Sequence, residues 1–352
     1  MPQSQANRTK FAGTIEARRL AELARAAGLG DSPDDALRGH QEAIVLLGSE
    51  EETPLLADVL RWQGSVLRDR GRTSEAEPLY QRSLQLSTKL EYPAGRAHAI
   101  NCLASLAQRR GDLSVAANLM TDSLALAQEC GESRLVGMLQ QNLGIVADIR
   151  GNPAAARAHY LVALRTFEAT NDLQPMCWVM NNLGYLNVKE ERFEEAEAVF
   201  ERALGIARAR GDLMAEGILE ENRAELELLR DNVEGSHASI ARALAIAEQR
   251  GDNVRRAAAL KLGGAYERLM GRPSEGADTL RHALTLSAVG EDALLGAEIF
   301  YQFGMALHAS GDVVMAKEVW KTALEAFERI AARQWAGRVR QRLIFGASSR
   351  YL

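Results

Sequence analysis

Apolar and small residues recur along this chain with a fixed period of forty residues. A leucine preceded by a small residue stands at every fortieth position, from Ser83-Leu84 to Ala323-Leu324, without insertion or deletion. A small residue precedes each of these leucines by eight positions, and a bulky residue precedes it by four. A long fixed period predicts a stack of similar units, each of which buries its apolar side against its neighbours.

Turn residues divide each unit into two helices. Gly71 and Gly111 belong to one set of turns, and Gly131 and Gly211 belong to a second set halfway between them. Glycine tolerates the left-handed backbone conformation that ends many helices, so both sets predict helix ends. Glu191 stands where the first set has glycine, and we expect the solenoid to continue there without a break.

Prolines support the same helix boundaries. Every proline after position 2 falls at or near a predicted helix start, where it costs little, whereas an interior proline costs about 3 kcal/mol. Thr53-Pro54 and a capping box from Ser74 to Glu77 are predicted starts, with Pro78 in a first turn.

Packing between the helices is predicted from residue size. Small residues such as Gly144 and Gly184 let neighbouring helices approach, and bulky residues such as Tyr160 and Phe200 fill the adjacent holes. The recurring leucines, for example Leu164, are predicted to be buried in the core. One continuous solenoid without an internal linker follows from this pattern.

The chain is therefore predicted to be all-α, with about eight two-helix repeats, or sixteen helices, and one capping helix. We expect residues 1–13 to form a polar arm, 14–332 the solenoid, and 333–352 the capping helix and tail. The period fails after residue 331, and the last helix carries an apolar stripe of Trp335, Val339 and Leu343.

The pairs Leu143-Gly144 and Leu183-Gly184, followed by small and bulky residues at fixed positions, resemble the tetratricopeptide repeat. The resemblance covers about residues 14–330 and implies a right-handed α-solenoid. The forty-residue period is similar to that of kinesin light chain, spindle-orientation adaptors and bacterial regulators. It implies a scaffold for protein-protein interaction whose partner is a protein or peptide in the concave groove of the superhelix.

The same resemblance implies that the first helix of each repeat lines the groove. An asparagine amide can donate to and accept from one peptide unit, yet asparagine is a poor residue for a helix interior. Three asparagines are therefore candidates for holding a ligand backbone, and the alternative is that each amide bonds the backbone of a neighbouring helix. Aromatic and methionine side chains offer apolar contact, and two glutamates would select positive charge. The candidates are Asn142, Asn182, Asn222, Met138, Gln141, Trp178, Asn181, Tyr185, Glu221 and Glu225.

Charge and composition limit the classes of molecule that we expect this chain to bind. The 352 residues contain 42 Lys and Arg against 47 Asp and Glu, a net charge of −5, which disfavours nucleic acid and anionic membrane. No apolar run approaches the roughly 18 residues that span a bilayer. Residues 1–13 lack the apolar segment of a signal peptide, so we expect a cytoplasmic protein. Cys102, Cys130 and Cys177 are too few and too far apart for a disulfide framework or a zinc site.

No catalytic or phosphate-binding motif is present, so we expect no enzymatic activity, no cofactor and no metal. Two other functions stay open. One is an effector-sensing regulator that switches by a change of the superhelix, and the other is an enzyme acting on DNA bases through Trp178, Tyr185 and Asp148. The charge balance argues against the enzyme.

The C-terminal arginines form the only local basic cluster in the sequence. A solvated face of the capping helix is the simpler interpretation, and an acidic partner or nucleic-acid phosphate is the alternative. The cluster consists of Arg329, Arg333, Arg338, Arg340, Arg342 and Arg350.

Overall fold

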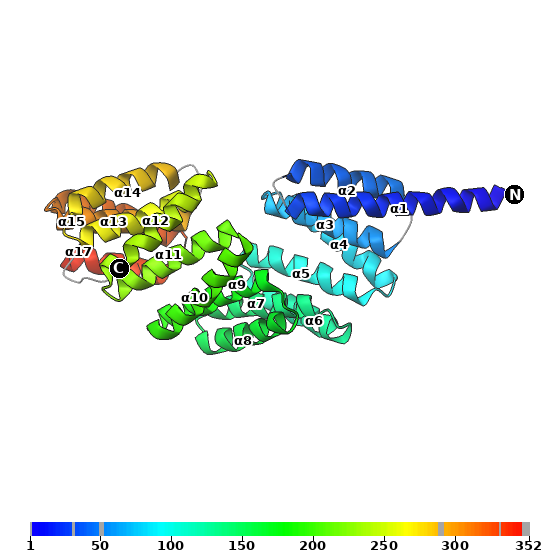
Figure 1. Ribbon diagram of the computed structural model, residues 1–352, viewed down its shortest axis with the longest axis horizontal. Coiled ribbons are helices and arrows are strands. Elements are labelled where there is room, and N and C mark those ends of the chain that lie inside the picture. Colours follow the sequence, from blue (N-terminus) through cyan, green and yellow to red (C-terminus); the bar gives the residue numbers. More distant parts are fainter. Residues whose placement is uncertain (1, 30–31, 49–52, 288–291, 331, 347–352) are drawn as a thin grey trace. The chain divides into compact units, whose positions relative to one another are not determined.

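The computed structural model describes residues 2–29, 32–48, 53–287, 292–330 and 332–346, with the side chains of residues 2–13 and 28–29 outside that description. These residues form seventeen α-helices and no strand (Figure 1). The prediction of an all-α chain with sixteen repeat helices and one terminal helix is thereby confirmed.

The chain divides into two compact units, residues 1–172 and 173–352, which are described separately. The prediction of one uninterrupted solenoid over 14–332 stays a prediction. The first unit contains α1 Pro2–Leu29, α2 Pro33–Leu47, α3 Pro54–Asp69, α4 Thr73–Lys89, α5 Pro93–Arg109, α6 Leu113–Glu129, α7 Ser133–Ile149 and α8 Pro153–Ala169. The second contains α9 Leu173–Lys189, α10 Phe193–Arg210, α11 Leu213–Leu229, α12 Val233–Gln249, α13 Asn253–Leu269, α14 Pro273–Ser287, α15 Ala293–Ala309, α16 Val313–Arg329 and α17 Arg333–Phe345.

Within each unit the helices pack as hairpins, for example α7 with α8 and α13 with α14 (Figure 1). The odd-numbered helices also pack on one another, in the order α1, α3, α5, α7 in the first unit and α9, α11, α13, α15 in the second. One helix of every repeat therefore contributes to a shared face of its unit. The first helix begins at Pro2, so it includes the residues that we expected as a polar arm.

Glycines and aromatic rings interlock between the two helices of a repeat, as the sequence predicts. A Cβ atom at Gly144 would collide with the ring of Tyr160, and one at Gly184 would collide with the ring of Phe200. Both rings are buried, with exposed fractions of 3% and 0%. The close approach of the helices thus requires glycine at these positions.

The recurring leucines are less uniformly buried than predicted. Leu204 is fully buried, but Leu164 is only half-buried. Leu204 also follows a buried alanine directly, so this position in the repeat does not by itself decide burial. The prediction of a buried Leu164 is wrong, and the buried residues of its helix are Ala156, Tyr160, Ala163 and Phe167.

The helix ends confirm most of the predicted turns. Glu191 adopts a left-handed φ of 57°. The N–H of Glu191 bonds the carbonyl of Val188 at 3.1 Å, and that of Arg192 bonds the carbonyl of Asn187 at 2.8 Å. This pair of bonds is the Schellman arrangement, in which a left-handed residue closes a helix. The hairpin of α9 and α10 therefore continues through the glycine-free turn, as expected.

Two predicted helix starts have different outcomes. Thr53 caps α3, because its Oγ1 accepts a hydrogen bond from the N–H of Leu56 at 3.2 Å. The capping box at Ser74 is wrong: α4 begins one residue earlier, at Thr73, after Arg72, which makes no side-chain cap. Pro78 consequently lies inside the helix, beyond the first turn.

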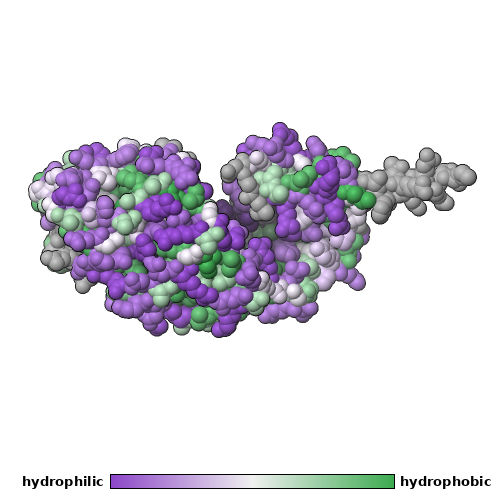
Figure 2. All heavy atoms as spheres, viewed as in Figure 1, coloured by the Kyte–Doolittle hydropathy of each residue, from purple (hydrophilic) through white to green (hydrophobic). Residues whose placement is uncertain are grey.

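The surface is mixed in character. Hydrophilic residues dominate the face shown in Figure 2, and hydrophobic ones lie between them. None of the described helices combines the length and the hydropathy that crossing a bilayer requires.

Candidate functional site

The predicted site residues lie on three helices in two units. The first unit holds three of them on α7: Met138, with 36% of its surface exposed, and the half-buried Gln141 and Asn142. The second unit holds the other seven, on α9 and α11. Asp148, invoked above for an enzyme, lies on α7 of the first unit, whereas Trp178 and Tyr185 lie in the second.

One face of α9 presents aromatic and amide side chains. Trp178, Asn182 and Tyr185 are spaced four and three residues apart, so they follow one another along the same side of the helix. Trp178 and Asn182 are half-buried, and Tyr185 is 45% exposed. The ammonium of Lys189 lies over the Tyr185 ring at 5.4 Å from its centre, a cation-π contact.

The asparagines of this face differ in their contacts. The side-chain amide of Asn222 on α11 donates to Oδ1 of Asn181 on α9 at 2.6 Å. Asn182 makes no side-chain hydrogen bond to any residue that the structure describes. Asn222 therefore does bond a neighbouring helix, although through a side chain, while the amide of Asn182 is available.

The two predicted glutamates also differ. Glu221 is 8% exposed and pairs with Arg255 of α13 at 3.0 Å. Burial raises the pKa of its carboxyl to about 7 against the opposing charges of Arg255 and Lys261. Glu225 is half-buried, and burial raises its pKa as well. Only Glu225 of the two has no ion pair within the described part of the chain.

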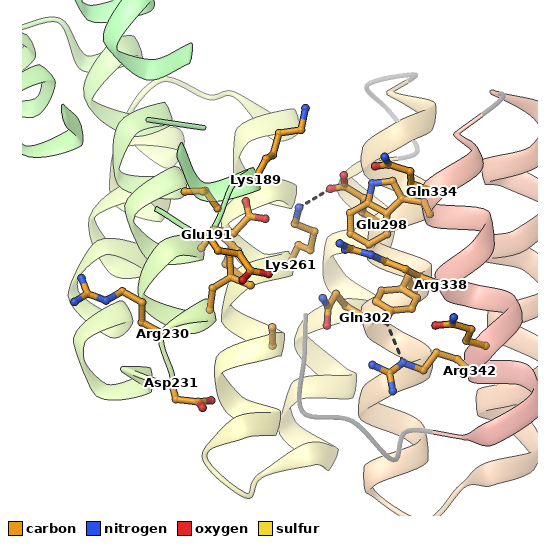
Figure 3. Close-up of a pocket in the computed structure, with 18 of the residues that line it drawn as sticks. Lys189, Glu191, Arg230, Asp231, Lys261, Glu298, Gln302, Gln334, Arg338 and Arg342 are labelled. Atoms are coloured by element: carbon orange, nitrogen blue, oxygen red, sulfur yellow. Dashed lines mark hydrogen bonds and ion pairs between the residues drawn. The ribbon is translucent and has the colours of Figure 1, made fainter. Parts of the chain in front are cut away.

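Tyr185 and Glu225 border a pocket in the second unit with a volume of about 1210 Å³ (Figure 3). Most of its lining residues come from α9, α11, α13, α15 and α17, and Phe193 lies at the start of α10. At its centre Lys261 of α13 and Glu298 of α15 form an ion pair of 2.5 Å. The charge of Glu298 and its neighbour Glu225 raises the pKa of Lys261, so the amine stays protonated.

The terminal helix α17 supplies one wall of this pocket, which the sequence did not predict. Arg338 and Arg342, four residues apart, line it from the same side of α17 (Figure 3). The Arg338 guanidinium lies 4.9 Å from the centre of the Trp335 ring, and Nε of Arg342 donates to the Tyr301 hydroxyl at 3.2 Å. The repeat period fails before this helix, so periodicity gave no way to place it.

The C-terminal arginines do not form one surface. Arg338 and Arg342 face the pocket, whereas Arg340 pairs with Glu328 of α16 at 2.5 Å. Arg350 lies outside the described residues. Arg338 is exposed and Arg342 is half-buried, so the expected solvated face holds for Arg338, which also borders the pocket.

Gln302 of α15 is a further pocket residue that the predicted set lacked. It is 6% exposed, and its Oε1 has no hydrogen-bond donor in the described chain. It stands eighty residues, or two repeat periods, after Asn222 and so occupies the equivalent position of a later repeat. That equivalence was the signal that could have identified it.

No cysteine is among the described residues that line this pocket. The three cysteines are free, and the buried Cys177 bonds the carbonyl of Ala203 at 3.7 Å, in the place where Ser83 bonds Ala57. Within the described ranges no group of three or more His, Cys, Asp or Glu side chains is arranged to hold a metal ion.

Comparison with known proteins agrees with this fold. Models of the tetratricopeptide repeat match residues 64–91 and 179–210. No curated protein matches the sequence.

Solved structures with the same fold have distant sequences. Aspartyl phosphate phosphatase F from Bacillus subtilis is 12% identical over 98% of this chain and 96% of its own, with a TM-score of 0.65. A signal transduction ATPase with a tetratricopeptide repeat sensor, PH0952 from Pyrococcus horikoshii, is 14% identical over 96% of this chain and 52% of its own, with a TM-score of 0.65. BtubC (BKLC) from P. vanneervenii is 21% identical over 69% of this chain and 92% of its own, with a TM-score of 0.51. The matching models identify residues 64–91 and 179–210 as tetratricopeptide repeats, and the solved structures share the all-helical fold of the chain.

Proposed function

We propose that this chain is a non-enzymatic protein-interaction module whose second unit binds an extended peptide or protein segment. The ligand lies on the face formed by α9, α11, α13 and α15. The observation that carries the proposal is the available amide of Asn182, which stands between Trp178 and Tyr185 on a face that adjoins a large pocket.

The side chains that recognise the ligand are preorganised for binding. The amide of Asn182 donates to and accepts from one peptide unit of the ligand, and the two aromatic side chains provide apolar contact at low entropic cost. Adjacent helices are about 8–10 Å apart and an extended chain advances about 3.3 Å per residue. Successive odd-numbered helices therefore meet the ligand at about every third residue.

The first unit offers the same kinds of side chain on α7, with Met138 for apolar contact and Gln141 and Asn142 for hydrogen bonds. Asn142 forms hydrogen bonds with the backbone of a ligand on that unit in the same way. The family supports a binding role, since PH0952 is described as having a tetratricopeptide repeat sensor.

A selection from random twelve-residue peptides displayed on phage, with the full chain immobilised, tests the proposal. Enriched peptides are synthesised with a fluorescent label, and the Kd is measured by anisotropy. Asn182→Ala should weaken binding by about 1–3 kcal/mol, the cost of an unpaired polar group in the complex. Asn118→Ala on the exposed side of α6 is the matched control and should have no effect. Absence of any enriched peptide would contradict the proposal.

A further inference from the structure

Arg268, in the last turn of α13, has a guanidinium that meets no acceptor. It follows Lys261 and Ala265, which line the pocket of the second unit, at helical spacing on the same side of α13. The residue is half-buried, and its Nε and Nη2 atoms are buried without a hydrogen-bond partner in the described chain. A cation that is partly removed from water and left unpaired is unfavourable, so this guanidinium favours a ligand that supplies an acceptor.

Arg68 shows what a partner does at the equivalent position, two hundred residues or five repeat periods earlier. Its Nε donates to Oδ1 of Asp69 at 2.8 Å. Burial lowers the pKa of Arg68, but the bond to Asp69 and other nearby groups outweigh burial, so that pKa ends above its usual value. Leu269 stands where the aspartate would be beside Arg268, and burial leaves the pKa of Arg268 below its usual value. The later repeat therefore has the arginine without its carboxylate.

The groups nearest to Arg268 are donors as well. After burial, Tyr301 and Arg342 are the groups that act on the pKa of Arg268, and the like charge of Arg342 lowers it further. Nε of Arg342 donates to the Tyr301 hydroxyl at 3.2 Å (Figure 3). Tyr301 is 1% exposed, and the proton of its hydroxyl has no acceptor in the described chain. Because buried polar groups nearly always have partners, α13, α15 and α17 leave a gap that an acceptor would fill.

The carboxylates of the pocket do not act on this position. Those that line the pocket are Glu191, Glu225, Asp231 and Glu298. None of them is among the groups that shift the pKa of Arg268. An anion beside Arg268 would therefore meet two cations and a hydroxyl donor, and no opposing carboxylate.

We propose that the second unit has a binding site for an oxyanion group, a phosphate or a carboxylate, between α13, α15 and α17. Its oxygen atoms accept from the guanidinium of Arg268 and from the Tyr301 hydroxyl, and its charge offsets the repulsion between Arg268 and Arg342. A guanidinium matches the paired oxygens of such groups. The site goes beyond the proposed function, because a free anion fills it as well as an acidic side chain of a bound segment does.

Isothermal titration calorimetry of the full chain with inorganic phosphate tests the site, at an ionic strength held constant with sodium chloride. We expect saturable binding. Arg268→Gln should raise the Kd about tenfold or more, because it removes a charge-assisted hydrogen bond, and Tyr301→Phe should raise it about fivefold. Arg250→Gln, at the exposed end of α12, is the matched control and should leave the Kd unchanged.

A further variant keeps Arg268 and gives it an internal partner. Leu269→Asp reproduces the pairing of Arg68 with Asp69 and should abolish phosphate binding. Circular dichroism checks that every variant folds. Without phosphate, Arg268→Gln should melt at or above the temperature of the unaltered chain, because it removes an unpaired cation. A lower melting temperature would show that the guanidinium serves the fold and would overturn the site.

Peptide selection identifies the source of the anion. Random twelve-residue peptides are selected on the unaltered chain and on Arg268→Gln. Enrichment of Asp and Glu on the unaltered chain alone would support the site and assign the anion to a bound segment. Phosphate binding that depends on Arg268, without such enrichment, would support the site and assign it to a free anion.

The outcomes distinguish the two proposals. If neither phosphate affinity nor the Asp and Glu content of the selected peptides depends on Arg268, the oxyanion site is overturned and the binding module stands. If no peptide is enriched but phosphate binding depends on Arg268, the binding module is contradicted and the oxyanion site stands.

Discussion

Asn222 donates its side-chain amide to Oδ1 of Asn181 at 2.6 Å and so joins α11 to α9 within the second unit. The neighbouring Asn182 takes no part in this bond. Asn222 therefore bonds a neighbouring helix, whereas we propose that Asn182, at the equivalent position one repeat earlier, binds the ligand.

This difference predicts opposite effects of the same substitution. Asn222→Ala should lower the free energy of unfolding by about 0.5–1.5 kcal/mol, because it removes a hydrogen bond between two helices. Asn182→Ala should leave that free energy unchanged and weaken peptide binding instead. Urea denaturation and anisotropy on both variants provide the test. A loss of stability alone in Asn182→Ala would show that its amide is structural.

Gly184 and Phe200 should be energetically coupled. Gly184→Ala places a methyl group against the Phe200 ring and should cost about 1–3 kcal/mol through overpacking. Phe200→Leu leaves room for that methyl group, so Gly184→Ala should cost less in the double variant. Gly205→Ala is the control, since nothing lies within 4 Å of a Cβ there, and it should stabilise α10 by up to about 1 kcal/mol. Additive effects in the double-variant cycle would refute the coupling.

Two leucines at equivalent positions should respond differently to truncation. Leu204 is fully buried, so Leu204→Ala should cost about 2–5 kcal/mol as a core cavity. Leu164 is half-buried, so Leu164→Ala should cost about 1 kcal/mol. Denaturant titrations measure both. Because repeats contact mainly their neighbours, hydrogen exchange in Leu204→Ala should rise most in α9 to α12. Uniform loosening of the second unit would contradict this picture.

Burial of Glu221 should make stability depend on pH. Its pKa is raised to about 7 in the fold, above the ordinary value of 4.5, so the folded state binds the proton more tightly than the unfolded state. Unfolding free energy should therefore fall as the pH rises from about 5 to about 7 and level off above that range. Glu221→Gln should flatten this decline, and the exposed Glu248→Gln should retain it. Urea denaturation from pH 5 to 8 gives the slopes, and equal slopes in all three proteins would refute the assignment.

Most of the fold could be predicted from the repeat period. It located the turn at Glu191 where glycine is absent, and it paired Gly184 with Phe200 sixteen residues away, because equivalent positions in a repeat have equivalent neighbours. The period did not resolve burial within a single turn of helix. Leu164 therefore was predicted as core although its side chain points partly outward.

The candidate site could be predicted only in part. The repeat identified α9 and α11 as helices that present Asn182 and Glu225, but it could not show that Glu221 is paired with Arg255, thirty-four residues later. Arg338 lies on a helix outside the period, and its position in the pocket depends on how α17 packs on α16. Such contacts between non-equivalent helices leave no regular pattern in a sequence.

The left-handed turns have a consequence for how such a chain can grow. At Gly111 and Gly151 the same two backbone hydrogen bonds recur. The glycine N–H donates to the carbonyl three residues before the glycine, and the N–H of the next residue donates to the carbonyl four residues before the glycine. A gene segment that encodes residues 112–151 therefore begins directly after one left-handed turn and ends at the next turn of the same kind. Its duplication would lengthen the stack by one hairpin without creating a backbone conformation that the protein does not already contain. New ligand-facing residues could then diverge on the added helix while the original ones remain in place.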